Sequence, residues 1–396
     1  MGIKLVGGAS TRSRARRPLP PGAMNGIVMG DDGVREHIEF EYSDRVEQEE
    51  ILSWVGGQAG LLWGHGPFPF EDVLLPYLMP GSYGDQSEHL LAEQLGAVYD
   101  GLLSSNDMAV RFFQNGSDAC SAAVRVARAV TGLSHIATQG YHGVHLDFSH
   151  EPDDVGYPTI IRDMNERFEF GNVTMMQDVA LRSSCLMVEV PPVPDNEARA
   201  FLRSCREMCD KYNIPFIIDD VVLGFRLELG GSCEYYGIKP DMACLGKAMS
   251  ATGCVSALIG RADMVGRLGD DVFYSTTFGG APGPCVIAAA TIEWLWENRE
   301  YVYGGKSNYG IGYLRGIGQK LMDGLNTVFI EQGRAARVIG QPVRSVLQFD
   351  KGDEARRAWC SEMIARGVML DRPQFPTLAH TMADVEKTIE VARSVE

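Results

Sequence analysis

Short apolar runs alternate with helical segments between about residue 86 and residue 290 of the chain. The runs are Leu186–Val190, Pro215–Ile218, Met242–Leu245 and Val255–Ile259. Strands of a parallel sheet are apolar along their whole length because helices cover both faces of the sheet. One of the helices is predicted at Ser117–Thr131, where alanine and valine form a stripe and Gly132 is a typical C-terminal stop. The pattern therefore predicts an α/β domain built on a mostly parallel sheet.

The pattern changes after about residue 300. The elements predicted there are a strand at Val343–Phe349, a helix at Glu354–Arg366, a strand at Val368–Leu370 and a helix at Ala383–Val395. This order indicates a smaller α+β domain. We expect an N-terminal arm over residues 1–50 that packs with the small domain, a large domain over 51–300 and the small domain over 301–396.

Composition and charge exclude several classes of partner. The formal net charge is −16, so nucleic acid and anionic membranes would be repelled, although four arginines lie between residues 11 and 17. No apolar stretch approaches the roughly 18 residues that a membrane span needs. The nine cysteines are scattered without a CxxC pair, which suits reduced thiols. We expect a soluble cytoplasmic enzyme without nucleic-acid or membrane partners.

Polar residues lie at the ends of the apolar runs: Glu189 after Leu186–Val188, the pair Asp219 and Asp220, and Gly246 with Lys247. Ligands of open α/β sheets bind at the carboxyl ends of the strands, so these residues are candidates for chemistry. A lysine in such apolar surroundings suits imine formation, although a lysine that reaches the surface fits the pattern equally well. Asp219 suits a partner for a cationic ring nitrogen, and an ordinary turn aspartate remains the alternative.

A third candidate site is the start of the helix near residue 116. Asn115, Gly116 and Ser117 open this helix, so its unbonded backbone N–H groups and positive dipole end would face an anion. Glycine lets a phosphate approach, and the serine hydroxyl adds a donor. An ordinary N-cap is the alternative.

Together these segments resemble the class III aminotransferases. Asp219–Arg226, Pro240-Asp241 and Gly246-Lys247 resemble the family's DEV-x-x-GFR, PD and GK motifs. Further segments resemble its phosphate, YHG and TFSGNP motifs: Gln114–Ala119, Tyr141–Gly143 and Thr277–Pro282. The C-terminal segments Arg366–Leu370 and Leu378–Thr388 are similar to the glutamate-1-semialdehyde 2,1-aminomutase subgroup in particular. Each motif is short, but their combination extends from about residue 12 to the end.

The resemblance implies a fold-type I transferase dependent on pyridoxal 5'-phosphate, with a large mostly parallel sheet of seven strands and a smaller α+β domain. Lys247 would hold the cofactor through a Schiff base and move a proton, and Asp219 would pair with its ring nitrogen. Tyr141 would stack on one face of the ring and Val221 would pack on the other.

The family also implies the rest of the cofactor site. Asn115, Gly116 and Ser117 would hold the phosphate and His142 would lie beside the cofactor. Thr277 would come from the neighbouring subunit, which implies a homodimer with shared active sites. The implied activity is transamination between a small-molecule amino donor and a carbonyl acceptor. Aminomutase, epimerase or decarboxylase chemistry on the same scaffold is the alternative.

The residues at which this sequence differs from the subgroup bear on the identity of the substrate. Asp118, Asp220 and Val190 are mild replacements, but Met29 stands where the aminomutases have an arginine that clamps the substrate carboxylate. Methionine cannot imitate a bidentate guanidinium, so we expect a substrate other than glutamate-1-semialdehyde. Arg226 and Arg372 are possible substitutes, without a spacing argument for either.

Two rival interpretations remain. His142, His145 and His150 lie within nine residues, but only the first two have helical i, i+3 spacing and Gly143 disfavours a helix, so we expect no metal site. A catalytically silent homologue that serves as a scaffold is the other rival, and it would have no need of both Lys247 and Asp219.

Overall fold

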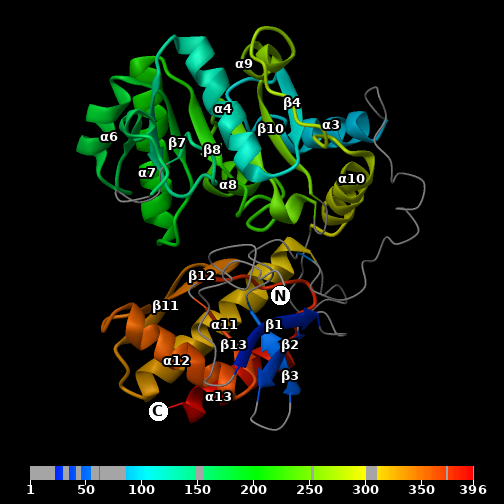
Figure 1. The fold of residues 1–396 in the computed structure, drawn as a ribbon, viewed down its shortest axis with the longest axis vertical. Helices are drawn as coiled ribbons and strands as arrows, with labels where there is room; N and C mark the ends of the chain where they lie inside the picture. Colours follow the sequence, from blue (N-terminus) through cyan, green and yellow to red (C-terminus); the bar gives the residue numbers. More distant parts are fainter. Residues whose placement is uncertain are drawn as a thin grey trace, which may run out of the picture. The chain divides into compact units, whose positions relative to one another are not determined.

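The computed structural model describes residues 23–29, 35–41, 46–54, 62, 86–148, 155–250, 254–299, 310–371 and 373–395; of residues 23–51 it describes the backbone alone. The chain divides into two compact units. One consists of Phe70–Glu300, and the other combines Met1–Pro69 with Tyr301–Glu396 (Figure 1).

The larger unit is built on a seven-stranded sheet with the order β4-β10-β9-β8-β7-β5-β6. Its strands are β4 (Met108–Phe113), β5 (His135–Gln139), β6 (Asn165–Arg167), β7 (Ser183–Val188), β8 (Phe216–Asp219), β9 (Met242–Leu245) and β10 (Ser256–Arg261). Strands β5 to β9 run parallel to one another, whereas β10 is antiparallel to both of its neighbours, β9 and β4. The predicted mostly parallel sheet is therefore confirmed, with one reversed strand.

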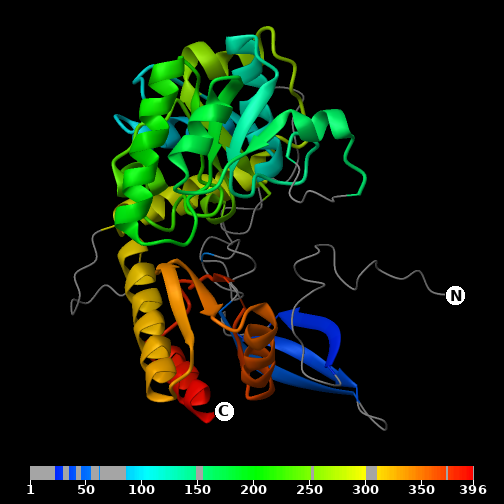
Figure 2. The same cartoon turned by 90° about the vertical axis from the view of Figure 1, so that its left-hand side faces the viewer.

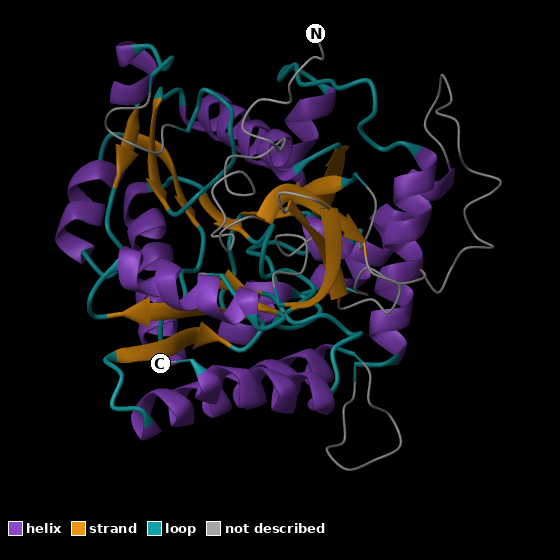
Figure 3. Ribbon diagram, turned by 60° about the horizontal axis from the view of Figure 1, so that its bottom comes forward, coloured by secondary structure: helices purple, strands orange, loops and turns teal. Residues whose placement is uncertain are grey.

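Helices lie on both faces of this sheet (Figure 3). Helix α4 (Gly116–Thr131) covers one face, where its buried alanines and valines pack on Cys185 and Met187 of β7. The intervening β7 residue, Leu186, is also buried and points to the opposite face. Helices α6 and α7 contact β7. Gly132 ends α4 with a left-handed φ of 72°, as the sequence predicts.

The remaining helices of the larger unit connect and cover the strands. They are α3 (Gln86–Tyr99), α5 (Thr159–Asp163), α6 (Val173–Ala180), α7 (Asp195–Tyr212), α8 (Gly231–Tyr236), η3 (Lys247–Met249), α9 (Ala262–Val265), η4 (Gly266–Gly269) and α10 (Pro282–Glu297). Among the described residues of the chain, no helix combines the length and the apolar character that a bilayer span requires.

The smaller unit contains two sheets, in the orders β1-β2-β3-β13 and β11-β12-β14. The strands are β1 (Ala23–Met29), β2 (Arg35–Glu41), β3 (Val46–Ser53), β11 (Ala336–Gln341), β12 (Arg344–Phe349), β13 (Val368–Met369) and β14 (Pro373–Gln374). The helices are α11 (Ile311–Glu331), α12 (Asp353–Ala365) and α13 (Met382–Ser394). Helix α11 packs along β11 and β12 (Figure 2). Strand β12 and helices α12 and α13 form within one residue of their predicted ends.

The core of the smaller unit is aromatic. The rings of Phe329, Phe349 and Trp359 contact one another in pairs, with centroids 5.3–5.8 Å apart. Trp54 stacks on His380 at 4.0 Å, and both side chains are fully buried. These contacts join the segment that follows β3 to the C-terminal part of the chain, far away in sequence.

Candidate active site

The candidate residues lie where parallel strands of the large sheet end. Asn115–Ser117 follow β4, Tyr141 and His142 follow β5, Asp219 is the last residue of β8, and Lys247 begins η3 after β9. The carboxyl ends of parallel strands lie at one edge of a sheet, so side chains that are distant in sequence converge there. The structure therefore brings these candidates to a common edge.

Asp219 is buried at this edge, with 4% of its surface exposed. Its Oδ2 lies 2.7 Å from Nδ1 of His142 and 3.5 Å from Sγ of Cys120, which donates to it. Its Oδ1 accepts a hydrogen bond from the backbone N–H of Val221 at 3.1 Å. Burial raises the pKa of the Cys120 thiol well above its usual value, so this group stays protonated and acts as a donor. Both carboxylate oxygens of Asp219 therefore have polar partners within the larger unit.

The strand register sets where Lys247 lies relative to Asp219. Strands β8 and β9 are parallel neighbours, and Asp219 is paired with Cys244, three residues before the lysine. Lys247 is partly buried and has a positive φ of 48°. A side chain other than glycine rarely adopts this conformation, which costs about 1–3 kcal/mol and is concentrated at functional sites. The strained backbone is therefore at Lys247, the lysine that the sequence motifs single out.

The start of helix α4 forms an anion-binding terminus. The side chain of Asn115 caps the helix by accepting from the N–H of Asp118 at 3.0 Å. The N–H groups of Gly116 and Ser117 make no hydrogen bond to the described residues, as the first turn of a helix requires. A Cβ on Gly116 would lie 2.8 Å from a methyl group of Val221, so only glycine fits between the helix start and this side chain.

The loop after β5 is fixed to this helix start. Val144 N–H donates to Oγ of Ser117 at 3.2 Å, and a Cβ on Gly143 would lie 2.2 Å from the same oxygen. Gly143 also has a φ of 105°, a conformation that favours glycine. The glycine of the YHG motif thus allows the loop to approach the serine closely.

Tyr141 is held in place by Glu189, a candidate to which the sequence assigns no role. Its backbone N–H donates to Oε2 of Glu189 at 3.1 Å, and Glu189 is buried at the end of β7. Tyr141 as a whole residue is 52% exposed. Burial, with Tyr157 and Glu189 as further causes, raises the pKa of the Tyr141 hydroxyl, so the phenol is neutral.

A second missed residue is Cys120, whose thiol contacts Asp219. Its position one turn after Gly116 on the stripe of α4 that faces the sheet is the signal in the sequence. A third is His145, with Nδ1 at 3.1 Å from Ser121 Oγ and Nε2 at 3.5 Å from Asp118. Cys120 thus links helix α4 to Asp219, and His145 links the loop after β5 to the same helix.

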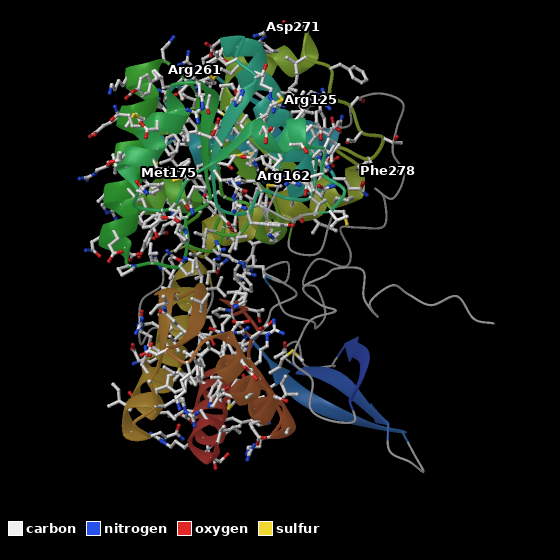
Figure 4. The ribbon with its side chains drawn as sticks, turned by 60° about the vertical axis from the view of Figure 1, so that its left-hand side comes forward. Arg125, Arg162, Met175, Arg261, Asp271 and Phe278 are labelled. Carbon is white, nitrogen blue, oxygen red and sulfur yellow. The ribbon has the colours of Figure 1, made fainter. Side chains whose placement is uncertain are left out.

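Thr277 is a candidate without a hydrogen bond to the other candidates among the described residues. It begins the exposed turn before α10, and no described contact joins it to the helix start. The next residue, Phe278, is 53% exposed and lies at the margin of the larger unit (Figure 4). Within one chain, the structure does not unite Thr277 with the other candidates.

The possible carboxylate clamps are not placed at an open site. Arg226 is fully buried, and burial lowers its pKa to about 10. Arg372 and His150 lie outside the described residues, as does the side chain of Met29 in β1. His142 and His145 lie in a loop, and no group of three or more metal-ligating side chains occurs in the described part of the chain.

The residues fit a group that carries both a phosphate and a protonated aromatic nitrogen. Helix α4 offers unbonded N–H groups and a glycine that clears space, and Asp219 offers a buried carboxylate. Lys247 and Tyr141 flank the same edge of the sheet. These residues would hold such a cofactor, with the N–H groups of α4 available to a phosphate and Asp219 available to a ring nitrogen.

Comparison with sequence relatives gives consistent results. Residues 195–309 match the family model described as aminotransferase class-III. The chain is 30% identical over 424 residues to a glutamate-1-semialdehyde 2,1-aminomutase of Thermomicrobium roseum, covering 96% of this chain and 95% of that protein. It is 29% identical over 297 residues to a 3-aminobutyryl-CoA aminotransferase of Cloacimonas acidaminovorans, covering 71% and 69%.

Solved structures share the fold. An omega-transaminase from Sphaerobacter thermophilus matches with a TM-score of 0.77 at 20% identity, covering 97% of this chain and 93% of that chain. A beta-phenylalanine aminotransferase from Variovorax paradoxus matches with a TM-score of 0.76 at 19% identity, covering 97% and 89%. The fold expected from the sequence is confirmed.

Proposed function

Since this chain belongs to the class III aminotransferase family, whose members use pyridoxal 5'-phosphate, we propose that Lys247 holds this cofactor and that Asp219 pairs with its ring nitrogen. The chain transfers an amino group between an amino donor and a carbonyl acceptor. The observation that carries the assignment of residues is the register of β8 and β9, which sets Asp219 beside Cys244 and the lysine just beyond it.

The bound cofactor supplies an electron sink that stabilises negative charge at the substrate Cα. Asp219 holds the proton on the ring nitrogen, because a carboxylate about 4 Å away at an effective dielectric of about 20 contributes roughly 4 kcal/mol. Nζ of Lys247, as a free amine, would take the proton from the substrate Cα, and the resulting ammonium would pass that proton on to the cofactor side of the bound substrate. The side chains of Tyr141 and Val221 would pack against the cofactor ring and exclude water from it.

The phosphate anchors the cofactor at helix α4. We assign this role to the N–H groups of Gly116 and Ser117, with the Ser117 hydroxyl oriented by the N–H of Val144. Asn115 stabilises the first turn of α4 through its capping hydrogen bond. His142 contacts Asp219 through its ring nitrogen Nδ1. A dianion in front of unbonded N–H groups gains from the helix dipole as well as from the hydrogen bonds.

The substrate we propose is an amine or amino acid other than glutamate-1-semialdehyde. Met29 in place of the arginine clamp supports this, and Arg226 is too deeply buried to replace it. Aminomutase activity is the second candidate, favoured by the similarity to the Thermomicrobium roseum protein. Turnover of glutamate-1-semialdehyde at an enzyme-like rate would favour aminomutase activity over transamination of another substrate.

We further propose that the enzyme is a cytoplasmic homodimer in which Thr277 reaches the phosphate of the neighbouring subunit. Exposed apolar side chains on the larger unit support a partner surface; they are Val144, Leu146, Ile160 and Phe278, each at least half exposed. None of the nine cysteines, all within described segments, forms a disulfide, which suits a reducing compartment. The mass in solution and the cofactor affinity of Thr277→Ala test this part.

The direct test of function is the visible spectrum of the purified protein with pyridoxal phosphate while candidate amino donors are added singly. We expect a yellow band that one donor bleaches in the wild type. We expect the Lys247→Ala variant to lack this band. A bound cofactor that no amine bleaches would contradict transamination, and the absence of any band in the wild type would contradict the cofactor assignment.

A further inference from the structure

The segment over residues 273–278, which contains Thr277, is anchored to the larger unit by one buried side chain. Tyr274 is 9% exposed and belongs to the core around helix α4, whereas Phe273 is 82% exposed and Phe278 is 53% exposed. The other residues of this segment are exposed or half-buried, and the structure describes all of them. Tyr274 is therefore the point at which the segment is attached to the core.

The hydroxyl group of Tyr274 reaches the first turn of helix α4. It donates to Oδ1 of Asp118 at 3.3 Å, although 156 residues separate the two in sequence. Burial, followed by the charge of the Asp118 carboxylate, raises the pKa of Tyr274, so the hydroxyl group stays protonated and acts as a donor. The side-chain amide of Asn115 donates to Oδ2 of the same aspartate at 2.8 Å. This chain of contacts connects the segment to the helix start.

Two further contacts restrain Tyr274 and the backbone beside it. The guanidinium of Arg125, a residue of α4 that Figure 4 labels, lies 4.7 Å from the centroid of the Tyr274 ring. It also donates to the carbonyl oxygen of Phe273 at 3.1 Å. The ring of Phe113 at the end of β4 meets the Tyr274 ring edge to face, with centroids 5.4 Å apart. The ring of Tyr274 is thus held by both α4 and β4.

The chain is restrained again just after Thr277. The N–H of Gly279 donates to the carbonyl oxygen of Thr276 at 3.3 Å, which closes a turn. A Cβ on Gly279 would lie 2.9 Å from the carbonyl oxygen of Phe112, so the turn lies directly against the end of β4. Thr277 is therefore an exposed residue between two points, Tyr274 and Gly279, that are fixed on the same unit.

We propose that Tyr274 is a positioning residue that, through Asp118 and Arg125, fixes the turn that presents Thr277 to the neighbouring subunit. The inference rests on the proposed function, in which Thr277 reaches the cofactor phosphate of that subunit. It follows that loss of the anchor weakens the cofactor site of the neighbouring subunit. The site of the subunit that carries the change keeps its own helix start and its own lysine.

Two variants at Tyr274 test the anchor in the cofactor-free protein. Tyr274→Phe removes the hydroxyl group alone, and Tyr274→Leu removes the ring contacts as well. The matched control is Tyr235→Phe, which removes a hydroxyl group that donates to Asp195 at 2.6 Å. We expect the peptide over residues 273–281 to exchange its amide hydrogens about fivefold faster in Tyr274→Leu than in the wild type, with Tyr274→Phe between them and the control unchanged. Equal exchange in all four proteins would overturn the inference, whatever the cofactor.

Mixed dimers, in which one subunit carries Lys247→Ala, show which cofactor site the anchor serves. Only the other subunit then gives the yellow band, and its phosphate is reached by Thr277 of the Lys247→Ala subunit. We expect Tyr274→Leu on the Lys247→Ala subunit to weaken cofactor affinity about tenfold, because the phosphate loses a charge-assisted hydrogen bond. On the subunit that retains Lys247, the same change should alter the affinity by less than about twofold.

The other outcomes contradict the inference in different ways. A loss that occurs only with Tyr274→Leu on the subunit that retains Lys247 would show that the anchor serves its own helix start. Equal losses from both placements would show that Tyr274 stabilises the fold without positioning the turn. A monomeric wild type, or a wild type without a yellow band, would overturn the proposed function and this inference with it.

Discussion

Asp220, the neighbour of the proposed cofactor partner, allows a quantitative prediction of pH-dependent stability. Its side chain is fully buried, and it accepts hydrogen bonds from the backbone N–H of Ser232 at 2.7 Å and from the Ser232 hydroxyl at 2.6 Å. Burial raises the pKa of Asp220 to about 7, despite these two bonds, which act in the opposite direction. The perturbation we propose is Asp220→Asn, which retains polar atoms for both contacts and cannot ionise.

The magnitude follows from the pKa difference between the folded and unfolded states. The unfolded chain releases this proton near pH 4 and the folded chain near pH 7, so folding loses stability as the pH rises between these values. Each unit corresponds to about 1.4 kcal/mol. Between pH 5 and pH 8 the wild type should therefore lose about 3 kcal/mol relative to Asp220→Asn. For a unit of roughly 230 residues this is about 6–12 °C in melting temperature.

The assay is a series of thermal melts of cofactor-free wild type and Asp220→Asn from pH 5 to pH 8. The control is Asp178→Asn, which removes a carboxylate from an exposed position on α6 and should follow the wild type at every pH. Parallel curves for wild type and Asp220→Asn would refute the reasoning, because they would show that the buried carboxyl group titrates equally in both states.

Three further predictions concern the site and the small unit. Gly116→Ala places a methyl group 2.8 Å from Val221 and should weaken cofactor binding about tenfold or more, whereas Gly96→Ala, with nothing within 4 Å, should leave the affinity unchanged; equilibrium titration compares the two. Asp219→Asn removes the charge that protonates the ring and should lower the turnover rate about 1000-fold, measured at saturating cofactor. His380→Leu removes hydrogen bonds at both ring nitrogens of a fully buried side chain and should cost about 2–4 kcal/mol in urea unfolding.

Much of the fold could be predicted because burial and helix ends leave local signals. Strand β9 coincides with the apolar run that predicts it, and Gly132 ends α4 as expected. Strand β7 begins at Ser183, three residues before the predicted start at Leu186, because Ser183 and Ser184 are polar yet fully buried in the strand. The reversal of β10 also could not be foreseen, since an apolar run carries no information about strand direction.

The candidate site could likewise be predicted from the sequence only in part. The strand-end position of Asp219 and Lys247 is visible in the sequence because both follow apolar runs directly. Two contacts join separate strand ends: that of His142 with Asp219, and the hydrogen bond from the Tyr141 N–H to Glu189. Such contacts depend on strand order and register, which a single sequence does not encode locally.

The central claim is that Lys247 is the residue that binds the cofactor covalently. The most direct measurement is reduction of the protein with borohydride in the presence of pyridoxal phosphate, followed by peptide mass mapping. The account predicts one reduced adduct, on the peptide that contains Lys247, and none in the Lys247→Ala variant. A reduced adduct on a different lysine, or no adduct in the wild type, would contradict it.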